Sequence, residues 1–248
     1  MAAFDRGIYR NARVAVVVLA RNEANTIADA VQAAAAFAHE VHVMDGHSSD
    51  DTPAIAARCG ASVHPDDGKG KGAAMRQSLE LAQTDVIVFM DADGSHDAAD
   101  IPKLVLPLIR GEADLCIGSR FTGGSEELSV DVGQLVRTIG NISMNIAINK
   151  RWHVSLTDTL NGFRAVRRQT ALQLGLVENA HTIEQEMVMK ALRHGYKVIN
   201  VPTHERARRY GTSHIKIWRE WPAFVWCVIV NIVRADLPHR RPSVTQRR

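Results

Sequence analysis

The sequence predicts an α/β protein with a mostly parallel central sheet and helices on both faces. Two observations predict this class. Short runs rich in β-branched residues, beginning with RVAVVVLA at residues 13–20, alternate with helix-like stretches, beginning at residues 22–38. The connections between them are short, as in βαβ units whose crossover helices cover both faces of a sheet. With 248 residues, 46% of them hydrophobic, the chain can bury one sizeable core.

The first half reads as a regular succession of elements. Continuous apolar runs predict strands buried on both faces, and alanine-rich stretches with polar residues near their start predict helices. At 51–60, Thr52 can cap a helix, Pro53 suits its first position and Gly60 its exit. The expected strands are residues 13–20, 40–45, 61–65, 85–93 and 113–120, and the expected helices are 22–38, 51–60, 68–84 and 100–111, the last kinked or shortened by Pro107.

The rhythm changes after Phe121. The expected elements are a loop at 122–131, a helix at 131–149, a short strand leading into a helix at 162–175, an amphipathic helix at 182–195 and a strand at 196–209. We interpret residues 1–218 as one domain and residues 219–248 as a C-terminal apolar helix with a basic tail.

The charge of the chain is unevenly distributed. The formal net charge is +3, but residues from Glu205 onward carry ten Lys/Arg against three Asp/Glu, or +7, which leaves −4 for residues 1–204. This split indicates an anionic partner near the C-terminal end, or simply a solvated basic tail. Three distant cysteines form no disulfide framework, and residues 1–14 contain no signal-peptide-like apolar stretch. We therefore expect a cytoplasmic protein.

Residues 221–233, WPAFVWCVIVNIV, form the most apolar late stretch. A membrane-spanning helix needs about 20 apolar residues, so this stretch is expected not to span. A core helix, an interfacial helix and an oligomer contact all fit it. The three tryptophans and two flanking arginines within residues 218–234 are typical of a membrane interface, which favours peripheral contact with the cytoplasmic membrane face.

Polar residues follow the expected strands at their carboxyl ends. In parallel α/β sheets ligands bind beyond these ends, so we expect a site there, although a cap or turn is the simpler explanation for Asp45 alone. The strand ends are Ala20-Arg21-Asn22-Glu23, Asp45-Gly46-His47, Asp91-Ala92-Asp93 and Ser119-Arg120.

Asp91 and Asp93 form an Asp-x-Asp directly after the most apolar strand. If the backbone turns there, both carboxylates can face one site and hold Mg²⁺ or Mn²⁺ together with waters and substrate phosphates. Such a triplet is common by chance in solvated loops. Its position at the end of a buried strand favours the metal-binding interpretation.

The glycine-rich stretch GKGKG at 68–72 resembles a phosphate loop but lacks the strict P-loop spacing, and no G-x-G-x-x-G follows the first strand. It still offers a helix N-terminus with backbone N–H groups and two lysines, or a flexible basic turn. His47 and His96 flank the expected site, and either contacts a ligand or is a polar loop residue. With 5% aromatic residues and no recognisable module, nucleic acid binding is not expected.

Several motifs, in this order, resemble one family. They are LARNEANTI (19–27), VMDGHSSDDT (43–52), GKGKGAA (68–74), MDADGSHD (90–97), GSRF (118–121), DTLNGFRAVRR (158–168), TIEQEM (182–187) and VPTHERARRYGTSHI (201–215). The chain resembles glycosyltransferase family 2, with the GT-A fold, and is most similar to the dolichyl- or polyprenyl-phosphate hexose (mannose or glucose) synthases. It differs from them at Leu19, Gly46, Ser95 and Thr212; Ser95 stands where the dolichyl-phosphate members often carry a glutamine that binds metal.

The resemblance implies roles for individual residues. Asn22, Glu23 and Asp45 would hold the base and ribose of a GDP- or UDP-hexose, and Asp91 and Asp93 the metal and the diphosphate. The further expected substrate contacts are Ala20, Lys71 and Glu184, and the expected contacts of the acceptor phosphate are Arg120, Arg164, Arg206 and Arg209. Asp91, Asp93, Arg120 and Asp158 are the expected catalytic residues.

The expected reaction is inverting transfer of a hexose to a polyprenyl phosphate, aided by a metal that neutralises the leaving diphosphate. A phosphate acceptor is already mostly dianionic at pH 7 and needs positioning only. An alcohol acceptor needs a general base, for which Asp158, Glu184 and Glu186 are available. The alternatives are a family 2 enzyme with a soluble hydroxyl acceptor, a nucleotidyltransferase without its N-terminal glycine-rich loop, and a non-catalytic binding protein. The sequence predicts neither the sugar nor the oligomeric state.

Overall fold

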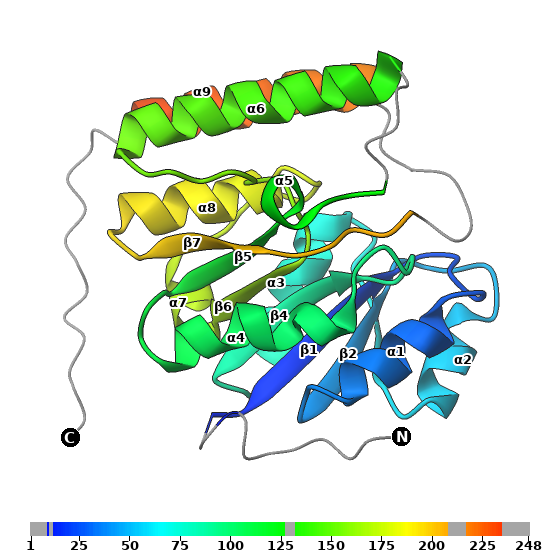
Figure 1. Cartoon of the computed structure of the whole chain (residues 1–248). Helices are drawn as coiled ribbons and strands as arrows, with labels where there is room; N and C mark the ends of the chain where they lie inside the picture. Colours follow the sequence, from blue (N-terminus) through cyan, green and yellow to red (C-terminus); the bar gives the residue numbers. More distant parts are fainter. Residues whose placement is uncertain (1–8, 10–11, 127–131, 208–216, 235–248) are drawn as a thin grey trace.

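The computed structural model describes residues 9, 12–126, 132–207 and 217–234. Seven strands form one sheet in the order β3-β2-β1-β4-β6-β5-β7, and only β6 runs antiparallel to its neighbours (Figure 1). The strands are β1 (Val14–Ala20), β2 (Glu40–Asp45), β3 (Ser62–Pro65), β4 (Val86–Asp91), β5 (Leu115–Ser119), β6 (Arg164–Arg167) and β7 (Val198–Pro202). The prediction of a mostly parallel sheet is confirmed; the insertion of β6 between β4 and β5 was not part of it.

Helices cover both faces of this sheet, as predicted. The helices are α1 (Ile27–Ala35), α2 (Thr52–Arg58), α3 (Lys71–Leu81), α4 (Ile101–Ile109), α5 (Arg120–Gly123), α6 (Val132–Trp152), α7 (Arg168–Gln173), α8 (Ile183–Arg193) and α9 (Ile217–Arg234), with a 3-10 turn at Ala98–Asp100. Helix α4 ends two residues after Pro107, which agrees with the expected shortening. Thr52, expected as a cap, is instead the first residue of α2.

The strands point alternate side chains into two hydrophobic clusters. Val16 of β1 and Val88 of β4 pack against α1, α2 and α4 on one face. Val17 and Phe89, one residue further along, pack against α3, α7 and α8 on the other. This alternation follows from the two-residue period of a strand, and it explains why the central strands are apolar throughout.

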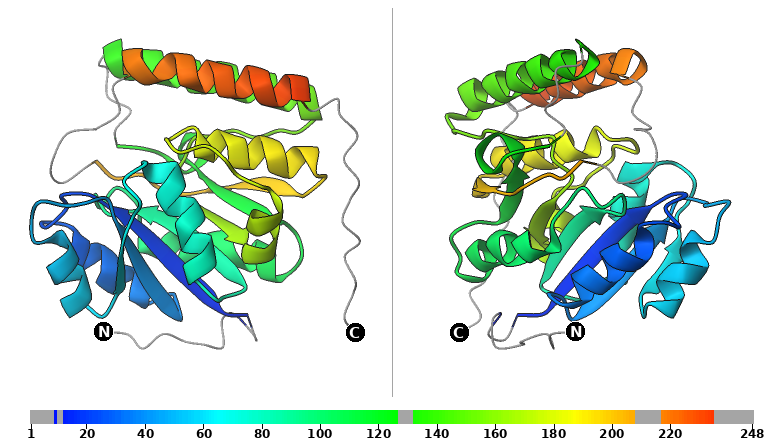
Figure 2. Two further views of the ribbon diagram at one scale, coloured as in Figure 1. Left: turned by 180° about the vertical axis from the view of Figure 1, so that it is seen from behind. Right: turned by 45° about the vertical axis from the view of Figure 1, so that its right-hand side comes forward.

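Helices α6 and α9 lie side by side as an additional layer outside α8 (Figures 1 and 2). They cross closely at Gly140, where an added Cβ would overlap the ring of Trp221. Within the part of the chain that the structure describes, neither of them, nor any other helix, has the length and apolarity needed to cross a membrane. Helix α9 packs against both α8 and α6. The division of the chain at residue 218 stays a prediction. The expected basic tail, residues 235–248, lies outside the described residues.

Candidate active site

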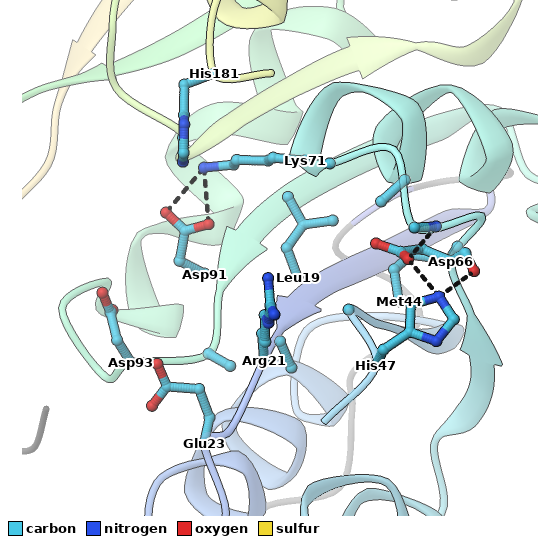
Figure 3. Close-up of a pocket in the computed structure, with 16 residues that line it drawn as sticks. Leu19, Arg21, Glu23, Met44, His47, Asp66, Lys71, Asp91, Asp93 and His181 are labelled. Carbon is cyan, nitrogen blue, oxygen red and sulfur yellow. Dashed lines mark hydrogen bonds and ion pairs between the residues drawn. The ribbon is translucent and has the colours of Figure 1, made fainter. Parts of the chain in front are cut away.

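A cleft of about 540 Å³ opens at the carboxyl ends of β1, β2 and β4 (Figure 3). This volume lies within the range of small-molecule sites. The sixteen lining residues are Leu19, Ala20, Arg21, Glu23, Met44, Gly46, His47, Asp66, Gly68, Gly70, Lys71, Ala74, Asp91, Ala92, Asp93 and His181. Five of the expected site residues are therefore brought together here: Ala20, Glu23, Lys71, Asp91 and Asp93.

The loop after β1 is held in place by the loop after β2. Asn22 adopts a left-handed backbone conformation, with φ of 56°. Its side-chain oxygen accepts a hydrogen bond from the backbone N–H of Ser49 at 2.7 Å, and its own N–H donates to the hydroxyl of Ser48. The N–H of Glu23 donates to the hydroxyl of Thr52 at 2.8 Å. Asn22 is thus a loop-organising residue outside the cleft lining, whereas Glu23 reaches the cleft.

Asp45 ends β2 and is buried. One carboxylate oxygen accepts a hydrogen bond from the N–H of Ser48 at 3.1 Å, while Oδ1 is buried with no hydrogen-bond partner among the described residues. A buried acceptor without a partner is costly, and a ligand N–H or hydroxyl can satisfy it. Next to it, His47 lies 3.0 Å from the backbone oxygen of Asp66 on the rim of the cleft.

Lys71 forms the charged centre of the cleft. Its ammonium lies 2.9 Å from Asp91 and 2.8 Å from Glu184. Burial alone would lower the pKa of Lys71, but the two carboxylates outweigh burial and raise it above the ordinary lysine value. Likewise burial would raise the pKa of Asp91, and the ammonium holds it below the ordinary carboxyl value. Lys71 and Asp91 are therefore expected to be charged at neutral pH.

Glycines permit this arrangement. A Cβ on Gly162 would lie 2.9 Å from the Lys71 ammonium and 3.0 Å from Asp91, so any larger residue would disturb the ion pair. Gly72 packs against residues 178–180, and its N–H donates to the carbonyl of Asn179 at 2.7 Å. The expectation of free N–H groups at the start of α3 is therefore not met at Gly72 and Ala73, whose N–H groups both donate to Asn179. Gly68, Gly70 and Lys71 line the cleft, whereas Lys69 pairs with exposed Asp67.

Asp93 is buried and lines the same end of the cleft as Glu23 (Figure 3). Its Oδ1 accepts hydrogen bonds from the N–H and hydroxyl of Ser95, at 3.0 and 2.6 Å. Ser95 therefore orients Asp93. His96 is buried, accepts from the N–H of Asp91 at 3.2 Å and stacks on Phe163, so it supports the Asp-x-Asp turn from behind.

Arg120 begins the short helix after β5 and forms a bidentate pair with Asp158, at 2.7 and 3.1 Å. Asp158 is fully buried and also accepts from Asn141 and from the N–H of Leu160. Burial alone would raise the pKa of Asp158, but Arg120 outweighs burial and lowers it. The structure does not support the expected role of Asp158 as a catalytic base, because both of its carboxylate oxygens already accept hydrogen bonds. Asp158 instead holds the guanidinium of Arg120 in position.

The four expected acceptor arginines have different surroundings. Arg164 is fully buried and donates to backbone carbonyls of Thr159, Asn161 and Glu184, so the expected contact with an acceptor phosphate is wrong. Arg206 is half-exposed and pairs with Asp97, just beyond the Asp-x-Asp turn. Arg209 lies outside the described residues. Arg120 and Arg206 flank Glu205, with Arg120 3.6 Å from its carboxylate.

Sequence analysis missed two features of the site. His181, before α8, lines the cleft and contributes to lowering the pKa of Asp91. Asparagines at 141, 145 and 149 of α6 all hydrogen-bond the loop at 156–159. Their spacing of four residues was a usable signal, because it places three amides on one helical face.

Solved structures share this fold. The glucosyl-3-phosphoglycerate synthase of Mycobacterium tuberculosis, in complex with Mn²⁺, UDP and phosphoglyceric acid, superposes with a TM-score of 0.71 over 94% of this chain and 82% of that chain, at 22% identity. Another structure of that enzyme contains Mg²⁺ and UDP, again with a TM-score of 0.71. At this identity the likeness shows the fold, which is of the GT-A type found in nucleotide-sugar-dependent transferases.

The family model described as "Glycosyl transferase family 2" matches residues 15–175, more than half of the chain. The chain therefore belongs to glycosyltransferase family 2 and is a glycosyltransferase. The glycosyltransferase AglJ of Haloferax volcanii is 33% identical over 203 residues, which span 81% of this chain and 65% of AglJ. An uncharacterized glycosyltransferase of Mycobacterium tuberculosis is 32% identical, over 82% of this chain and 89% of that protein. The dolichyl-phosphate hexose transferase of Haloferax volcanii is 30% identical, over 68% and 71%.

Proposed function

We propose that this glycosyltransferase moves a hexose, with inversion, from a nucleotide diphosphate sugar to a polyprenyl phosphate such as dolichyl phosphate, in a metal-dependent reaction. Two relatives support the proposal. The dolichyl-phosphate hexose transferase is 30% identical to this chain over an aligned region of 169 residues, which covers 68% of this chain. The structurally similar synthase binds UDP and Mn²⁺ in the same fold. We place the reaction in the cytoplasm, at the membrane face that holds the lipid.

The donor fits the cleft between the ends of β1, β2 and β4. The unpartnered Oδ1 of Asp45 offers a hydrogen-bond acceptor to a base or ribose. Glu23 and Lys71 line the same cleft. Lys71 supplies a positive charge for the diphosphate, while Glu184 and Asp91 remain as acceptors for sugar hydroxyls. Both GDP- and UDP-hexoses remain open as donors.

The carboxylates of Asp91 and Asp93 are suited to Mg²⁺ or Mn²⁺, because these ions prefer oxygen ligands and complete their shells with water and substrate phosphates. No group of three or more His, Cys, Asp or Glu side chains arranged for a metal occurs in the described part of the chain. The donor set is thus two carboxylates, and the diphosphate must supply further ligands. The metal would neutralise charge on the leaving diphosphate. Lys71, now paired with Asp91, would shift toward the phosphates.

The single observation that carries the choice of acceptor is the Arg120–Asp158 pair. Asp158 cannot take a proton from an alcohol while it holds Arg120, Asn141 and the N–H of Leu160. Glu186 is also unsuited to act as a base, because its carboxylate accepts hydrogen bonds from two backbone N–H groups. Arg120, by contrast, is partly exposed and permanently charged, as a phosphate contact requires. A dianionic phosphate then attacks without a general base.

A soluble acceptor is the second candidate. The structurally similar synthase contains phosphoglyceric acid beside UDP, so this fold also accommodates a small acceptor. For such an acceptor Glu184 is the remaining base among the three candidates, and Lys71 would have to release it.

The decisive experiment is a panel of GDP- and UDP-hexoses with polyprenyl phosphate and with soluble acceptors, in Mg²⁺, Mn²⁺ or EDTA. We expect transfer to polyprenyl phosphate only with metal, with a rate that rises through the second phosphate pKa near ~6 and then stays level. The Arg120→Ala variant should raise the acceptor KM more than the donor KM, and Arg120→Lys should retain part of the effect. Exposed Arg110 provides a matched control. Transfer only to soluble acceptors, or full activity in EDTA, would contradict the proposal.

A further inference from the structure

Helix α6 exposes a stripe of isoleucines, although it also buries Met144 and Ile148 in the core. Its buried positions include Asn141 and Asn145, whereas Ile139, Ile142 and Ile146 are 55%, 43% and 60% exposed. Exposed isoleucines three and four residues apart form one continuous stripe. Such an orientation leaves an apolar helical surface in water, which is unfavourable unless something covers it.

Helix α9 extends the same surface. Trp226, Ile229 and Val233 are exposed, and every exposed residue in the described stretch 221–233 is apolar. The opposite side of α9, with Cys227 and Val228, packs into the cluster that also receives Met144 of α6. Since both helices bury one side in the same core, their exposed sides face the same way. We call this surface, formed by Ile139, Ile142, Ile146, Trp226, Ile229 and Val233, the α6–α9 face.

The charge around this face is positive. Helix α6 contains Lys150 and Arg151 in its last turn and no Asp or Glu. Anionic lipid headgroups complement such a surface, and each Lys or Arg near the membrane strengthens binding by about five-fold. A second copy of this chain would instead bring the same positive charge to the contact. Trp226, at 66% exposure, is of the residue type enriched at membrane interfaces.

The inner side of α6 contacts the acceptor end of the site. Asn141 donates to Asp158, which holds Arg120, and Asn145 donates to the carbonyl of Thr157. A phosphate bound at Arg120 would therefore lie about one helix diameter, ~10 Å, from the apolar face. The first units of a polyprenyl chain attached to that phosphate can span this distance while the rest of the chain stays in the membrane.

We propose that the α6–α9 face docks on the surface of an anionic membrane and holds Arg120 next to the lipid acceptor. This inference rests on the proposed function for its account of the acceptor, but membrane binding itself can be measured without substrate. It includes α6 in the docking surface together with the C-terminal helix.

The test is co-sedimentation of the full chain with phosphatidylcholine vesicles, with and without phosphatidylglycerol, in the absence of donor and acceptor. We expect binding to the anionic vesicles, weakened by salt, and at least ~50-fold weaker binding for an Ile146→Glu and Trp226→Glu double variant. The matched control is Leu172→Glu, an exposed apolar position on α7. Thermal unfolding of each variant verifies that it folds.

Several outcomes would overturn the proposal. The proposal is contradicted if the wild-type protein does not bind anionic vesicles. It is also contradicted if the double variant binds them as well as the wild type does. A wild-type dimer that the double variant converts to monomer, with no vesicle binding by either, identifies the face as a subunit interface instead.

Activity assays separate this proposal from the proposed function. The double variant should keep its turnover of a short, water-soluble polyprenyl phosphate and lose turnover of the long acceptor in vesicles. If vesicles are bound but no polyprenyl phosphate is used, the proposed function fails and the docking surface stands.

Discussion

Helix α1 and helix α6 both pack on the protein, but they bury different kinds of side chain. In α1, Ile27 and Val31 are buried and Asp29 is exposed. In α6, Asn141 and Asn145 are buried beside Met144, while Ile146 is exposed. The first arrangement is the usual one for a helix that packs on a sheet in water. The second requires hydrogen-bond partners for the buried amides, because an unpaired polar group costs free energy, and both amide NH₂ groups donate to the loop at 156–159.

This difference shows what each region is built for. The half that contains β1 to β4 and α1 to α4 buries apolar side chains and presents charged groups at the strand ends, where Lys71 and Asp91 meet. In the outer layer, the polar side of α6 instead hydrogen-bonds the loop that contains Asp158, which in turn binds Arg120. We therefore propose that the first half, the donor half, determines the chemistry and that the outer layer positions Arg120 for the acceptor. Four predictions test this division, in order of decreasing effect.

Replacement of Asp93 by alanine should have the largest effect on transfer. Loss of a metal-binding carboxylate removes several kcal/mol of stabilisation of the leaving diphosphate, or about 10³-fold in kcat. Vesicle binding should not change, because Asp93 lies in the cleft and not in the outer layer. Thermal stability should fall modestly, because Asp93 is buried and its loss leaves the N–H and hydroxyl of Ser95 without this acceptor. Asp67→Ala, an exposed carboxylate outside the cleft lining, is the control. Near-normal turnover of the Asp93→Ala variant would show that the metal does not depend on this residue.

Replacement of Lys71 by methionine should destabilise the fold. It leaves Asp91 and Glu184 facing each other without a cation, and removal of one partner from a buried ion pair costs about 3–5 kcal/mol. Denaturant unfolding measures this loss. Lys69→Met, which breaks only an exposed pair with Asp67, should leave the free energy of unfolding nearly unchanged.

The pH dependence of this loss follows from the shifted pKa values. Asp91 has a lowered pKa, so its contribution is complete above the unfolded value near ~4 and is lost as pH falls through the lower folded value. Lys71 has a raised pKa, so its contribution is complete below ~10 and is lost as pH rises through the higher folded value. Lys71→Met leaves Asp91 buried beside a second carboxylate without a cation, so protonation should relieve the variant as pH falls. The difference between wild type and Lys71→Met should therefore narrow on acidification. A difference that stays the same as pH falls would mean that the pair is not ionised in the wild type.

Replacement of Asn145 by alanine tests the inner side of α6. Asn145 donates to the carbonyl of Thr157 and accepts from the N–H and hydroxyl of Thr159, so the variant leaves buried groups unpaired at a cost of about 1–3 kcal/mol. Because Asp158 lies between these two threonines, the acceptor KM should rise as well, with little change in the donor KM. Ser143→Ala, on the exposed side of the same helix, serves as the control. An unchanged acceptor KM would separate α6 from the positioning of Arg120.

The sequence predicted the donor half well and the outer layer poorly, for a physical reason. Strands such as β4 are continuous apolar runs that end in charged residues, so both the strand and its functional end can be read locally. The partners of a buried charge cannot be read in this way. Nothing near Arg164 in the sequence indicates that backbone carbonyls would enclose it, or that Lys71 would lie between Asp91 and Glu184.

The orientation of α6 was hidden for a related reason. The isoleucines at 139, 142 and 146 and the asparagines at 141, 145 and 149 both follow helical spacing, and periodicity alone does not say which stripe is buried. The usual expectation that apolar residues face the core holds for Met144 and Ile148 but gives the wrong answer for the other three isoleucines. The deciding contacts come from a loop at 156–159 that follows the helix in the chain and folds back along it.

A matched pair of substitutions tests the opening comparison and gives the smallest effect. Val31→Asn in α1 places an amide in the apolar core and should cost about 2–4 kcal/mol. Ile146→Asn in α6 makes the same kind of change at a position that is 60% exposed, and should alter the free energy of unfolding by no more than about 0.5 kcal/mol. Both values come from denaturant unfolding of the full chain. A loss at Ile146 as large as that at Val31 would mean that another part of the protein covers the α6–α9 face in solution, which removes the surface on which membrane docking depends.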